Sequence, residues 1–591
     1  MKIFGIGQNR IITQTISRLL ACSEIRKNEG YEGVTDIYKF NFFDHDFTLI
    51  SLNDKFLKLR SNFVFKSQLD MFKQDVEMVP CCKQIIKIIK ENILNSDILL
   101  LFFSNTREYE SIADDIEMYC KRIKDNVEIQ KPMFNFLGKD SLIEEIKATR
   151  KINIFRSISG KLEYLMNFRV KNIMSSILTP ILNNYSQEKR NKYLLTISQL
   201  SILAQIVKFN YEKTTFKPEI YYEIECKINK TEKKCKFCWE RKRLFCKLSS
   251  IAIYSSILID NNKSNINIDE NLYKEEKPLP LNCTKLICLG MKYLKLDDNK
   301  IIELAQSLYE EGYITYPFNN CDSFPDDFNF LPIILMLASY TPLTKHAAIL
   351  RRSYIPPRKG KYQSTIHLPI YPIKVLNDIP KTDDKMKLYD LIARHFLAEC
   401  SNDAIMKTVT YSFIYNEEKF STSITNVEDP QFLNVYSFKK YPKKDLYNFT
   451  NNSEIQIFTY KLNEKKTLPP PPLSKIQLIK FISKKNINRN TKNTVKDIEK
   501  LLKYGLIDIK SEVIESTKLG FALIASFEEI GFNFTSSYLC NQFNNILNNL
   551  SFHNGDQKNL QNQIYQQFGS FLYTTMKNQN KFKEVFQTIF K

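Results

Sequence analysis

Short apolar runs alternate with segments of helical periodicity over the first 150 residues of the chain. This alternation predicts a parallel β-sheet covered by helices on both faces, with ligands bound at the carboxyl ends of its strands. Those ends fall at residues 7–9 and 104–110. The expected strands are residues 2–6, 47–52 and 97–103, and the expected helices are residues 13–25, 83–94 and 111–123.

Beyond residue 150 the pattern changes several times. It predicts helices over 150–210, strands over 213–275, helices from about 284 to 400 and strands from about 405 to 460. The run "TLPPPPLSK" at 467–475 must be extended, because proline lacks a backbone N–H and clashes with a preceding helical turn. This run is the clearest boundary in the chain, and everything after it has a helical pattern. We find no internal repeat.

Length and charge narrow the class of protein. A chain of 591 residues exceeds what one hydrophobic core usually supports, so several domains or packed modules are expected. The net charge of +20 would attract a polyanion such as nucleic acid. The chain is also rich in Lys, Asn and Ile, and biased codon usage explains the charge equally well. Charge alone leaves both interpretations open.

Cysteine usage and hydropathy indicate an intracellular protein. Thirteen cysteines, an odd and scattered number, are typical of a reduced compartment rather than of a disulfide framework. No window approaches the roughly 18 consecutive apolar residues that a membrane span needs, and the N-terminus lacks a signal-peptide pattern. We therefore expect a soluble protein of the cytosol or nucleus with no membrane partner.

Tyr316 raises the main question of chemistry. It follows an amphipathic helix that is predicted to end at Gly312, and it precedes a proline. A phenol is a poor nucleophile at its ordinary pKa, so a tyrosine that attacks phosphorus needs help with its proton and with the phosphate charge. Tyr316 is one of 31 tyrosines, most of which must be structural, and its spacing alone does not decide between the two roles.

The surrounding residues resemble a specific family. The stretch "ELAQSLYEEGYITYP" at 303–317, followed by "FP" and "DDFNF", is similar to the active-site segment of type IA DNA topoisomerases, most closely the topoisomerase III branch. Further segments resemble the family in the same order, over about residues 3–575. They are "SRLLACSEIRKNEGYEGVTDIYKFNF" (17–42), "FCWERKRLFC" (237–246), "TIHLPIYPIK" (365–374) and "YDLIARHFLAECSNDA" (389–404).

The resemblance implies a fold and a reaction. The expected fold is a multidomain α/β protein with helical and β-rich parts that closes a toroid, and its N-terminal Toprim domain is a parallel α/β unit. In the family, the tyrosine in the place of Tyr316 attacks a single-strand phosphodiester and forms a 5′-phosphotyrosine link. The implied domains are 1–150 (Toprim), 151–212 (first helical part of domain IV), 213–275 (first part of the β-rich arch, domain II), 276–404 (domain III with Tyr316), 405–466 (second part of the arch) and 467–591 (C-terminal part of domain IV).

The metal site of the family is degenerate in this chain. Gln8 and Asn9 stand where the family has an acid and a lysine, and Ser104 and Thr106 stand where it has two aspartates. Mg²⁺ is expected from the family, but it binds through carboxylate oxygens, and the remaining candidate is Glu110, assisted by Glu108 or by Asp114 one turn on. An amide at Gln8 cannot donate a proton to a leaving oxygen as a carboxylic acid would.

No zinc is expected. A Cys-x-x-Cys pair lies in a predicted strand and has no second pair at ribbon spacing, and the family's C-terminal cysteine modules are absent. The cysteines concerned are Cys226, Cys235, Cys238 and Cys246.

Other family positions are partly retained. Phe318 stands in place of the arginine that clamps the scissile phosphate, and Tyr371 stands in place of a histidine. Arg169, Gln199 and His367 match residues that the family uses to bind nucleic acid. For His367, a satisfied structural histidine is an equally good interpretation, because no partner carboxylate is obvious. A basic segment with interleaved tyrosines precedes His367 and suits phosphate neutralisation and base stacking, although a solvated loop would have the same composition. Its basic residues are Arg351, Arg352, Arg358, Lys359 and Lys361.

Two functions compete on this sequence. The first is a diverged topoisomerase III that cleaves, passes and rejoins single DNA strands. The second is a catalytically silent relative that binds single-stranded DNA and acts as a scaffold. A basic structural protein without a nucleic-acid partner is a third, weaker hypothesis. The resemblance further implies nuclear placement, and a RecQ-type helicase and an OB-fold accessory protein as partners.

Overall fold

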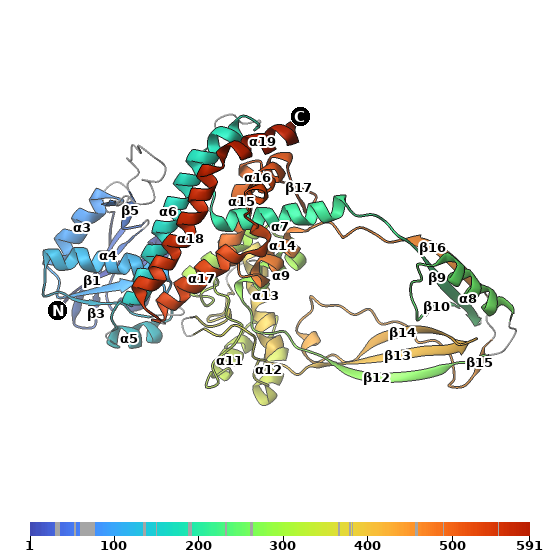
Figure 1. The fold of residues 1–591 in the computed structure, drawn as a ribbon. Coiled ribbons are helices and arrows are strands. Elements are labelled where there is room, and N and C mark those ends of the chain that lie inside the picture. Colours follow the sequence, from blue (N-terminus) through green and yellow to red (C-terminus); the bar gives the residue numbers. More distant parts are fainter. Residues whose placement is uncertain are drawn as a thin grey trace.

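The computed structural model of the protein (Figure 1) describes most of the chain. The described residues are 1–591 except 30–35, 53–54, 60–76, 134–136, 149, 187–191, 231–232, 260–263, 365–366, 378–379, 381, 456–458, 488–489 and 554. Among the described residues, no helix combines the length and the apolar character that crossing a membrane requires.

A six-stranded sheet forms the N-terminal part of the molecule. Its order is β2 (Arg26–Glu29), β3 (Asp36–Phe42), β4 (His45–Ser51), β1 (Lys2–Gly7), β7 (Ile98–Phe102) and β8 (Glu128–Gln130). Strands β4, β1, β7 and β8 pair in parallel, which confirms the predicted parallel sheet. Strands β2 and β3 add an antiparallel edge, because the short β3–β4 connection, with Phe43 at φ 51°, is a hairpin turn.

Helices cover both faces of this sheet, as the alternation of apolar residues along β1 requires. Phe4 and Ile6 pack with α3 (Lys83–Leu94) and α4 (Arg107–Ile123), while Ile3 on the other face packs with α1 (Arg10–Leu20) and α5 (Lys139–Lys147). A small hairpin of β5 (Leu57–Leu59) and β6 (Met78–Pro80) lies beside them. The carboxyl ends of β1 and β7 therefore meet at one edge, next to the start of α1 and α4.

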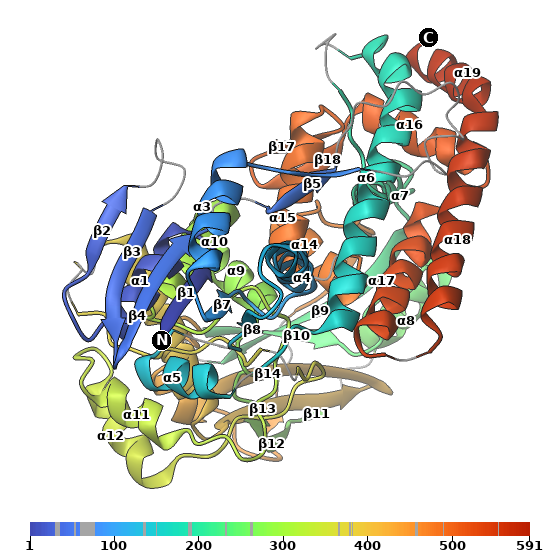
Figure 2. The same cartoon turned by 90° about the vertical axis from the view of Figure 1, so that its left-hand side faces the viewer.

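A helical body packs against α4. Figures 1 and 2 both show α6, α17 and α18 side by side, with α6 crossing from the N-terminal sheet to the far end of the body. Its elements are α6 (Ile154–Asn183), α7 (Ile197–Thr214), α14 (Lys475–Lys484), α15 (Thr491–Lys503), β17 (Ile507–Lys510), β18 (Val513–Ser516), α16 (Lys518–Glu529), η4 (Phe534–Ser536), α17 (Tyr538–Ser551), α18 (Gln557–Lys577) and α19 (Gln579–Phe590).

The hairpin β17–β18 departs from the helical pattern predicted after residue 475. Ser511 and Glu512 both have positive φ, 49° and 68°, which is the geometry of a two-residue hairpin turn. Neither residue is a glycine or an asparagine, the residues typical of such a turn, so the sequence does not predict this hairpin.

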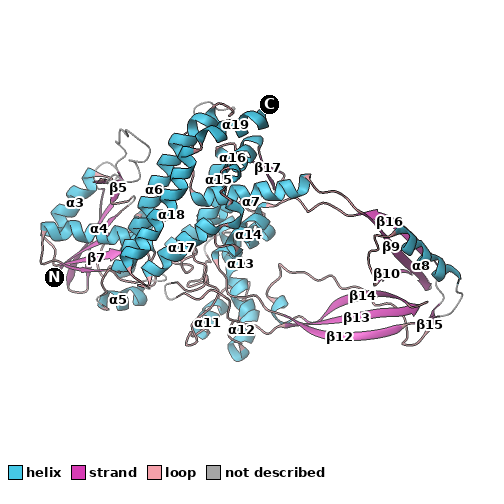
Figure 3. Cartoon of the chain, in the orientation of Figure 1, coloured by secondary structure: helices cyan, strands magenta, loops and turns pink. Residues whose placement is uncertain are grey.

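A β-rich arch leaves the body after α7 and returns to it through the extended run before α14 (Figure 3). Its main sheet has the order β12-β13-β14-β10-β9-β16. Helix α8, within the segment expected to be β-rich, was not predicted because its residues are mostly β-branched or small. The arch elements are β9 (Ile220–Lys230), β10 (Lys233–Trp239), α8 (Lys247–Ile259), β11 (Ser264–Asn265), β12 (Asn267–Glu275), β13 (Ala404–Tyr415), β14 (Glu418–Asp429), η3 (Gln431–Asn434), β15 (Glu454–Ile455) and β16 (Thr459–Lys466).

The segment that carries Tyr316 joins the body, the sheet and the arch. Helix α10 ends at Glu310, and Gly312 takes φ +79°, a left-handed conformation that favours glycine and turns the chain towards Tyr316. Thr315 then exchanges backbone and side-chain hydrogen bonds with Tyr371 and Pro369. The helices here are α9 (Cys283–Leu289), η2 (Gly290–Leu294), α10 (Asp298–Glu310), α11 (Leu331–Ala338), α12 (Thr344–Ser353) and α13 (Asp384–Glu399).

Gly160 permits the close approach of α6 to α4. A Cβ at this position would lie 2.3 Å from the carbonyl oxygen of Arg107, in the first turn of α4. Gly160→Ala should therefore lower the apparent Tm by several degrees, because overpacking of this kind costs about 1–3 kcal/mol. Thermal denaturation measures the effect, with Ser176→Ala at an exposed position of the same helix as control. Equal melting temperatures for the two variants would contradict this account of the junction.

Candidate functional site

Tyr316 lies in a cluster of rings between α10 and the carboxyl ends of the N-terminal strands. Its ring stands edge-on to Tyr309, with centroids 5.4 Å apart, and to Phe318 at 5.8 Å. It stacks on His367 at 4.6 Å with an interplanar angle of 26°. Burial, followed by the proximity of Tyr309 and Tyr109, raises the pKa of the Tyr316 phenol well above its ordinary value of 10.0. The phenol is therefore protonated in the resting protein.

His367 is a neutral imidazole with unused hydrogen-bonding capacity. Burial, followed by the charges of Arg156 and Lys131, lowers the pKa of His367 to about 3. Both ring nitrogens are buried, and neither has a hydrogen-bond partner among the described residues. Buried polar atoms normally find partners, so this ring is open to a ligand beside Tyr316.

The two replaced residues at the end of β1 hold the site together. Gln8 accepts a hydrogen bond from the backbone N–H of Ser104 at 3.0 Å, which ties the ends of β1 and β7. Asn9 caps α1 by accepting from Ile12 N at 2.9 Å, and its Nδ2 donates to Glu310 Oε1 at 2.7 Å. Asn9 thus connects the N-terminal sheet to the last turn of α10.

Glu110, the candidate for a metal ligand, is already engaged by a buried cation. Its Oε1 lies 3.1 Å from Lys131 Nζ, and its Oε2 accepts from Asn153 N at 3.1 Å. Lys131 Nζ also donates to Asn105 Oδ1 at 2.9 Å. Burial lowers the pKa of Lys131, and the Glu110 carboxylate opposes that shift.

The side chains around Glu110 do not fit Mg²⁺. A divalent cation on this carboxylate would face the Lys131 ammonium at contact distance, and like charges repel strongly in a buried setting. Ser104 and Thr106 offer only hydroxyl groups, and Thr106 is used as the cap of α4. In the described part of the chain, no group of three or more His, Cys, Asp or Glu side chains could hold a metal ion.

Glu108 and Arg107 face away from this ion pair towards α6. Glu108 lies 3.3 Å from Lys55, whose ammonium sits 3.7 Å above the ring of Tyr164. Arg107 is buried and donates to Ser159 Oγ at 2.8 Å, and burial lowers the pKa of Arg107 to about 10.

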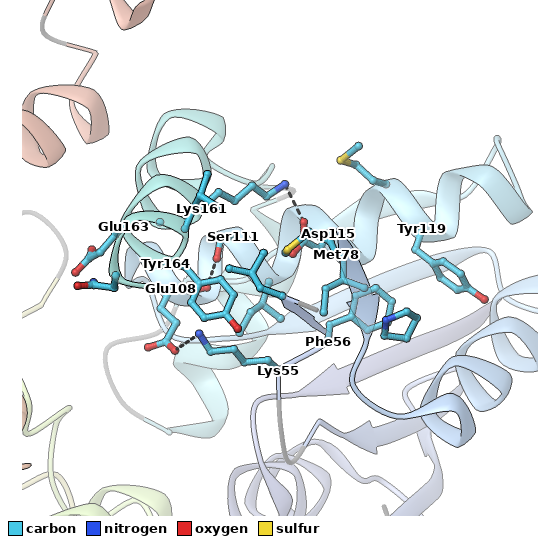
Figure 4. Close-up of a pocket in the computed structure, with 18 of the residues that line it drawn as sticks. Lys55, Phe56, Met78, Glu108, Ser111, Asp115, Tyr119, Lys161, Glu163 and Tyr164 are labelled. Carbon is cyan, nitrogen blue, oxygen red and sulfur yellow. Dashed lines mark hydrogen bonds and ion pairs between the residues drawn. The ribbon is translucent and has the colours of Figure 1, made fainter. Parts of the chain in front are cut away.

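A cavity of about 840 Å³ opens on this side, and Figure 4 shows Lys55, Glu108 and Tyr164 together in its lining. Among the described residues, Tyr316 and His367 do not line the cavity. It is therefore separate from the Tyr316 cluster.

The remaining predicted positions are spread over the molecule. Tyr371 is buried among aromatic rings behind Thr315, and this burial raises its pKa. Gln199 is fully buried, completes the capping box of α7 and donates to Asp497 Oδ1 at 2.8 Å. Arg169 lies on α6, with its guanidinium 6.0 Å from the ring centre of Tyr565. The structure brings none of these three side chains into contact with Tyr316.

The basic segment lies on the surface of the Tyr316-bearing part. Arg351 and Arg352 are exposed in the last turn of α12, and Lys361 is exposed beyond it. Arg358 pairs with Glu276, and Lys359 pairs with Asp326. Surface pairs of this kind are weak, so these cations remain available to a polyanion.

Three residues of the site escaped the sequence analysis. Lys131 directly follows β8, which is the position where a strand-end ligand is expected, and that placement could have found it. Tyr109 is half-buried, and burial raises its pKa to about 12. Glu310 is buried at the end of α10, and no local pattern marks its contact with Asn9.

Comparisons with known proteins agree with this arrangement. A sequence model of the family described as DNA topoisomerase matches residues 182–561. The chain belongs to this family. The full-length topoisomerase I of Thermotoga maritima has the same fold, with a TM-score of 0.72 and 16% identity over 96% of this chain and 90% of that one.

Relatives place the chain nearer to one branch of the family. It is 24% identical to DNA topoisomerase 3 of Schizosaccharomyces pombe, over 90% of this chain and 89% of that protein. It is 23% identical to human DNA topoisomerase 3-alpha, over 90% of this chain and 54% of that protein. The chain is thus a type IA, topoisomerase III-like protein with the mixed α/β fold of that class. These relatives support topoisomerase function, which is an isomerase reaction. They do not favour a catalytically silent strand-binding protein over a topoisomerase.

The ion pair between Lys131 and Glu110 should contribute strongly to stability. Lys131→Met leaves a buried carboxylate without its cation, and we expect a loss of about 3–5 kcal/mol in the free energy of unfolding. Adding Glu110→Gln should restore much of that loss, because the uncompensated charge is then removed.

Denaturation in urea measures both effects. Lys121→Met is the matched control, because it breaks an exposed pair with Glu117 and should cost less than about 1 kcal/mol. A Lys131→Met protein as stable as this control would show that the buried pair is not formed.

Proposed function

We propose that Tyr316 is the nucleophile with which this topoisomerase III-like protein cleaves and rejoins single DNA strands. The observation that carries the proposal is the place of Tyr316, stacked on an unpartnered imidazole where α10 meets the carboxyl ends of the N-terminal strands. Ligand sites in sheets of this kind lie at that edge. By resemblance to the family, the product is a 5′-phosphotyrosine link.

The reaction makes and breaks one bond to phosphorus in each direction. The Tyr316 Oη–P bond forms as the bond from phosphorus to the 3′-oxygen breaks; the phenol gives up its proton, and the departing oxygen takes one up. Rejoining reverses both steps after another strand has passed. Because burial raises the pKa of the phenol, only a small fraction of it is ionised at neutral pH, and loss of this proton limits the attack.

Side-chain cations are proposed to meet the phosphate charge in place of Mg²⁺. The family expectation is a Mg²⁺-dependent enzyme, yet the carboxylates needed for it are replaced or already paired. Arg156 and Lys131 lie close enough to His367 to lower its pKa, so two cations lie near the ring on which Tyr316 stacks. Preorganised charge of this kind is the usual means by which enzymes stabilise a phosphoryl transition state.

Family membership also suggests the setting of the reaction. We propose a nuclear enzyme that acts on single-stranded DNA, since relatives such as the human protein are eukaryotic topoisomerases of branch 3. A RecQ-type helicase and an OB-fold accessory protein are the partners that the resemblance suggests. The domain limits proposed from the sequence provide the truncation points with which to test such partners.

Covalent capture tests the nucleophile. A labelled single-stranded oligonucleotide incubated with the protein and then denatured should carry its label onto the unmodified chain, and Tyr316→Phe should abolish this adduct. Tyr313→Phe, a nearby tyrosine on the same segment, should keep it. We expect the adduct to persist in EDTA, and an absolute requirement for Mg²⁺ or Mn²⁺ would contradict the proposed charge neutralisation.

The outcome also separates the two functional hypotheses. Salt-sensitive binding of the oligonucleotide should be equal in the unmodified chain and in Tyr316→Phe. Binding without any adduct in the unmodified chain would identify a silent strand binder instead.

Adduct formation should accelerate with pH. Only the phenolate attacks readily, and the folded-state pKa of Tyr316 is raised above 10.0, so the phenolate fraction is small at pH 7 and grows about tenfold per pH unit below that pKa. Single-turnover rates between pH 7 and 9.5 should rise without a plateau. A plateau below pH 8 would mean that another group, or another tyrosine state, controls the step.

A further inference from the structure

Lys492 presents an ammonium group without a carboxylate partner beside the Tyr316 cluster. Its Nζ lies 4.0 Å from the centre of the Phe318 ring, and Phe318 stands edge-on to Tyr316 at 5.8 Å. The ammonium is therefore one ring away from the nucleophile. In the described part of the chain no ion pair joins it to an Asp or Glu, and the charges of Glu310 and Glu108 act on it from beyond that distance.

The start of α15 fixes this lysine in place. Asn490 caps the helix by accepting from Lys492 N at 2.8 Å, and its Nδ2 donates to the carbonyl oxygen of Phe318 at 2.9 Å. The same residue therefore ties the backbone of Lys492 to the backbone of Phe318. This link holds although the two residues belong to different parts of the fold.

A polar chain connects Lys492 to the end of β1. The Nζ atom of Lys492 lies 3.5 Å from Gln306 Oε1. The Nε2 atom of Gln306 donates to Glu310 Oε1 at 2.6 Å, and Asn9 Nδ2 donates to the same oxygen at 2.7 Å. The ammonium thus lies between Phe318 and Asn9, the two positions at which the sequence analysis found a neutral residue where a cation was expected. The lysine contacts the ring of Phe318 directly and is connected to Asn9 only through Gln306 and Glu310.

Energetics favour an anionic ligand for this group. Lys492 is half-buried, and burial, followed by the charge of Lys496, lowers its pKa. A partly desolvated ammonium that rests on an aromatic face gains only about 1–2 kcal/mol from that contact, which does not replace a paired anion. A phosphate diester bound beside Tyr316 and Phe318 would bring an anion to this ammonium, and lysine is an effective phosphate-binding residue.

We propose that Lys492 contacts the scissile phosphate and stabilises the charge that develops on it when Tyr316 attacks. The cation normally expected beside the tyrosine is then supplied by helix α15. The ring of Phe318 holds the ammonium in position through a cation–π contact. This inference rests on the proposed role of Tyr316.

Two variants and one matched control test the role in cleavage. Lys492→Met keeps the length of the side chain and removes its charge, and we expect the single-turnover rate of adduct formation to fall by about 10²–10³-fold. Lys492→Arg should retain most of the rate. Lys496→Met removes the same charge one turn along α15 from an exposed position, and its rate should stay within about twofold of the unmodified chain.

A rescue variant and a binding measurement exclude a purely structural role. Phe318→Arg added to Lys492→Met should recover adduct formation at least tenfold, because it returns a cation to the same place. In the Tyr316→Phe background, Lys492→Met should reduce the salt slope of single-strand binding by about 0.7, the value for one lost phosphate contact. Equal melting temperatures for the variants show that folding is retained.

Each outcome decides between the proposals. An unchanged rate in Lys492→Met, or equal losses in Lys492→Met and Lys496→Met, would overturn the role of Lys492 while leaving Tyr316 as nucleophile. No adduct in the unmodified chain would overturn the proposed function instead. In that case an unchanged salt slope in Lys492→Met would overturn the phosphate contact as well.

Discussion

Glu310 joins the tyrosine-bearing segment to the N-terminal sheet, and the position of Tyr316 depends on that junction. Its side chain accepts from Asn9 Nδ2 at 2.7 Å, and its backbone oxygen accepts from Thr15 Oγ1 at 2.6 Å. These contacts join residues about 300 positions apart, so they cannot form until both parts of the chain have folded. Gly312 then redirects the backbone, and Tyr316 comes to lie at the strand ends rather than on the outer surface of α10.

The sequence predicts the parts of the fold that depend on local pattern. The parallel strands, α3 and the extended proline run all follow from periodicity or from the chemistry of proline, and the structure contains them. Helix α8 and the hairpin β17–β18 were missed, because β-branched residues obscure a helical period and a turn of Ser511 and Glu512 lacks the usual glycine. Tyr316 was found only through the resemblance of its surroundings. Lys131, Glu310 and Lys492 act across the fold, and no spacing along the chain predicts such contacts.

The replacement of acids by amides and hydroxyls changes how charge is arranged around the nucleophile. The side chains at three of the substituted positions, Gln8, Asn9 and Thr106, now accept backbone hydrogen bonds, and those of Asn9 and Thr106 cap helices. The hydroxyl of Ser104 is buried without a partner among the described residues. The carboxylate of Glu110, which remains, is balanced by Lys131. The Glu110 charge is thus balanced without a metal ion, whereas the carboxylate of Glu310 accepts hydrogen bonds from the amides of Asn9 and Gln306. A polyanion instead meets a neutral imidazole and nearby cations, an arrangement consistent with a site that binds phosphate directly.

The two junctions that enclose the site differ in strength, and strand passage requires one of them to open. Between α4 and α6, backbone contact at Gly160 is reinforced by the buried Arg107–Ser159 hydrogen bond and by Lys161, which pairs with Asp114 at 2.6 Å. Between α1 and α10, the polar contacts are the hydrogen bonds to Glu310, which contribute about 1 kcal/mol for the backbone oxygen and about 1.5–3 kcal/mol for the carboxylate. A separating force would break the second junction first. Tyr316 would then move with α10, away from the strand ends, while the contacts between α4 and α6 keep the helical body attached to the N-terminal sheet.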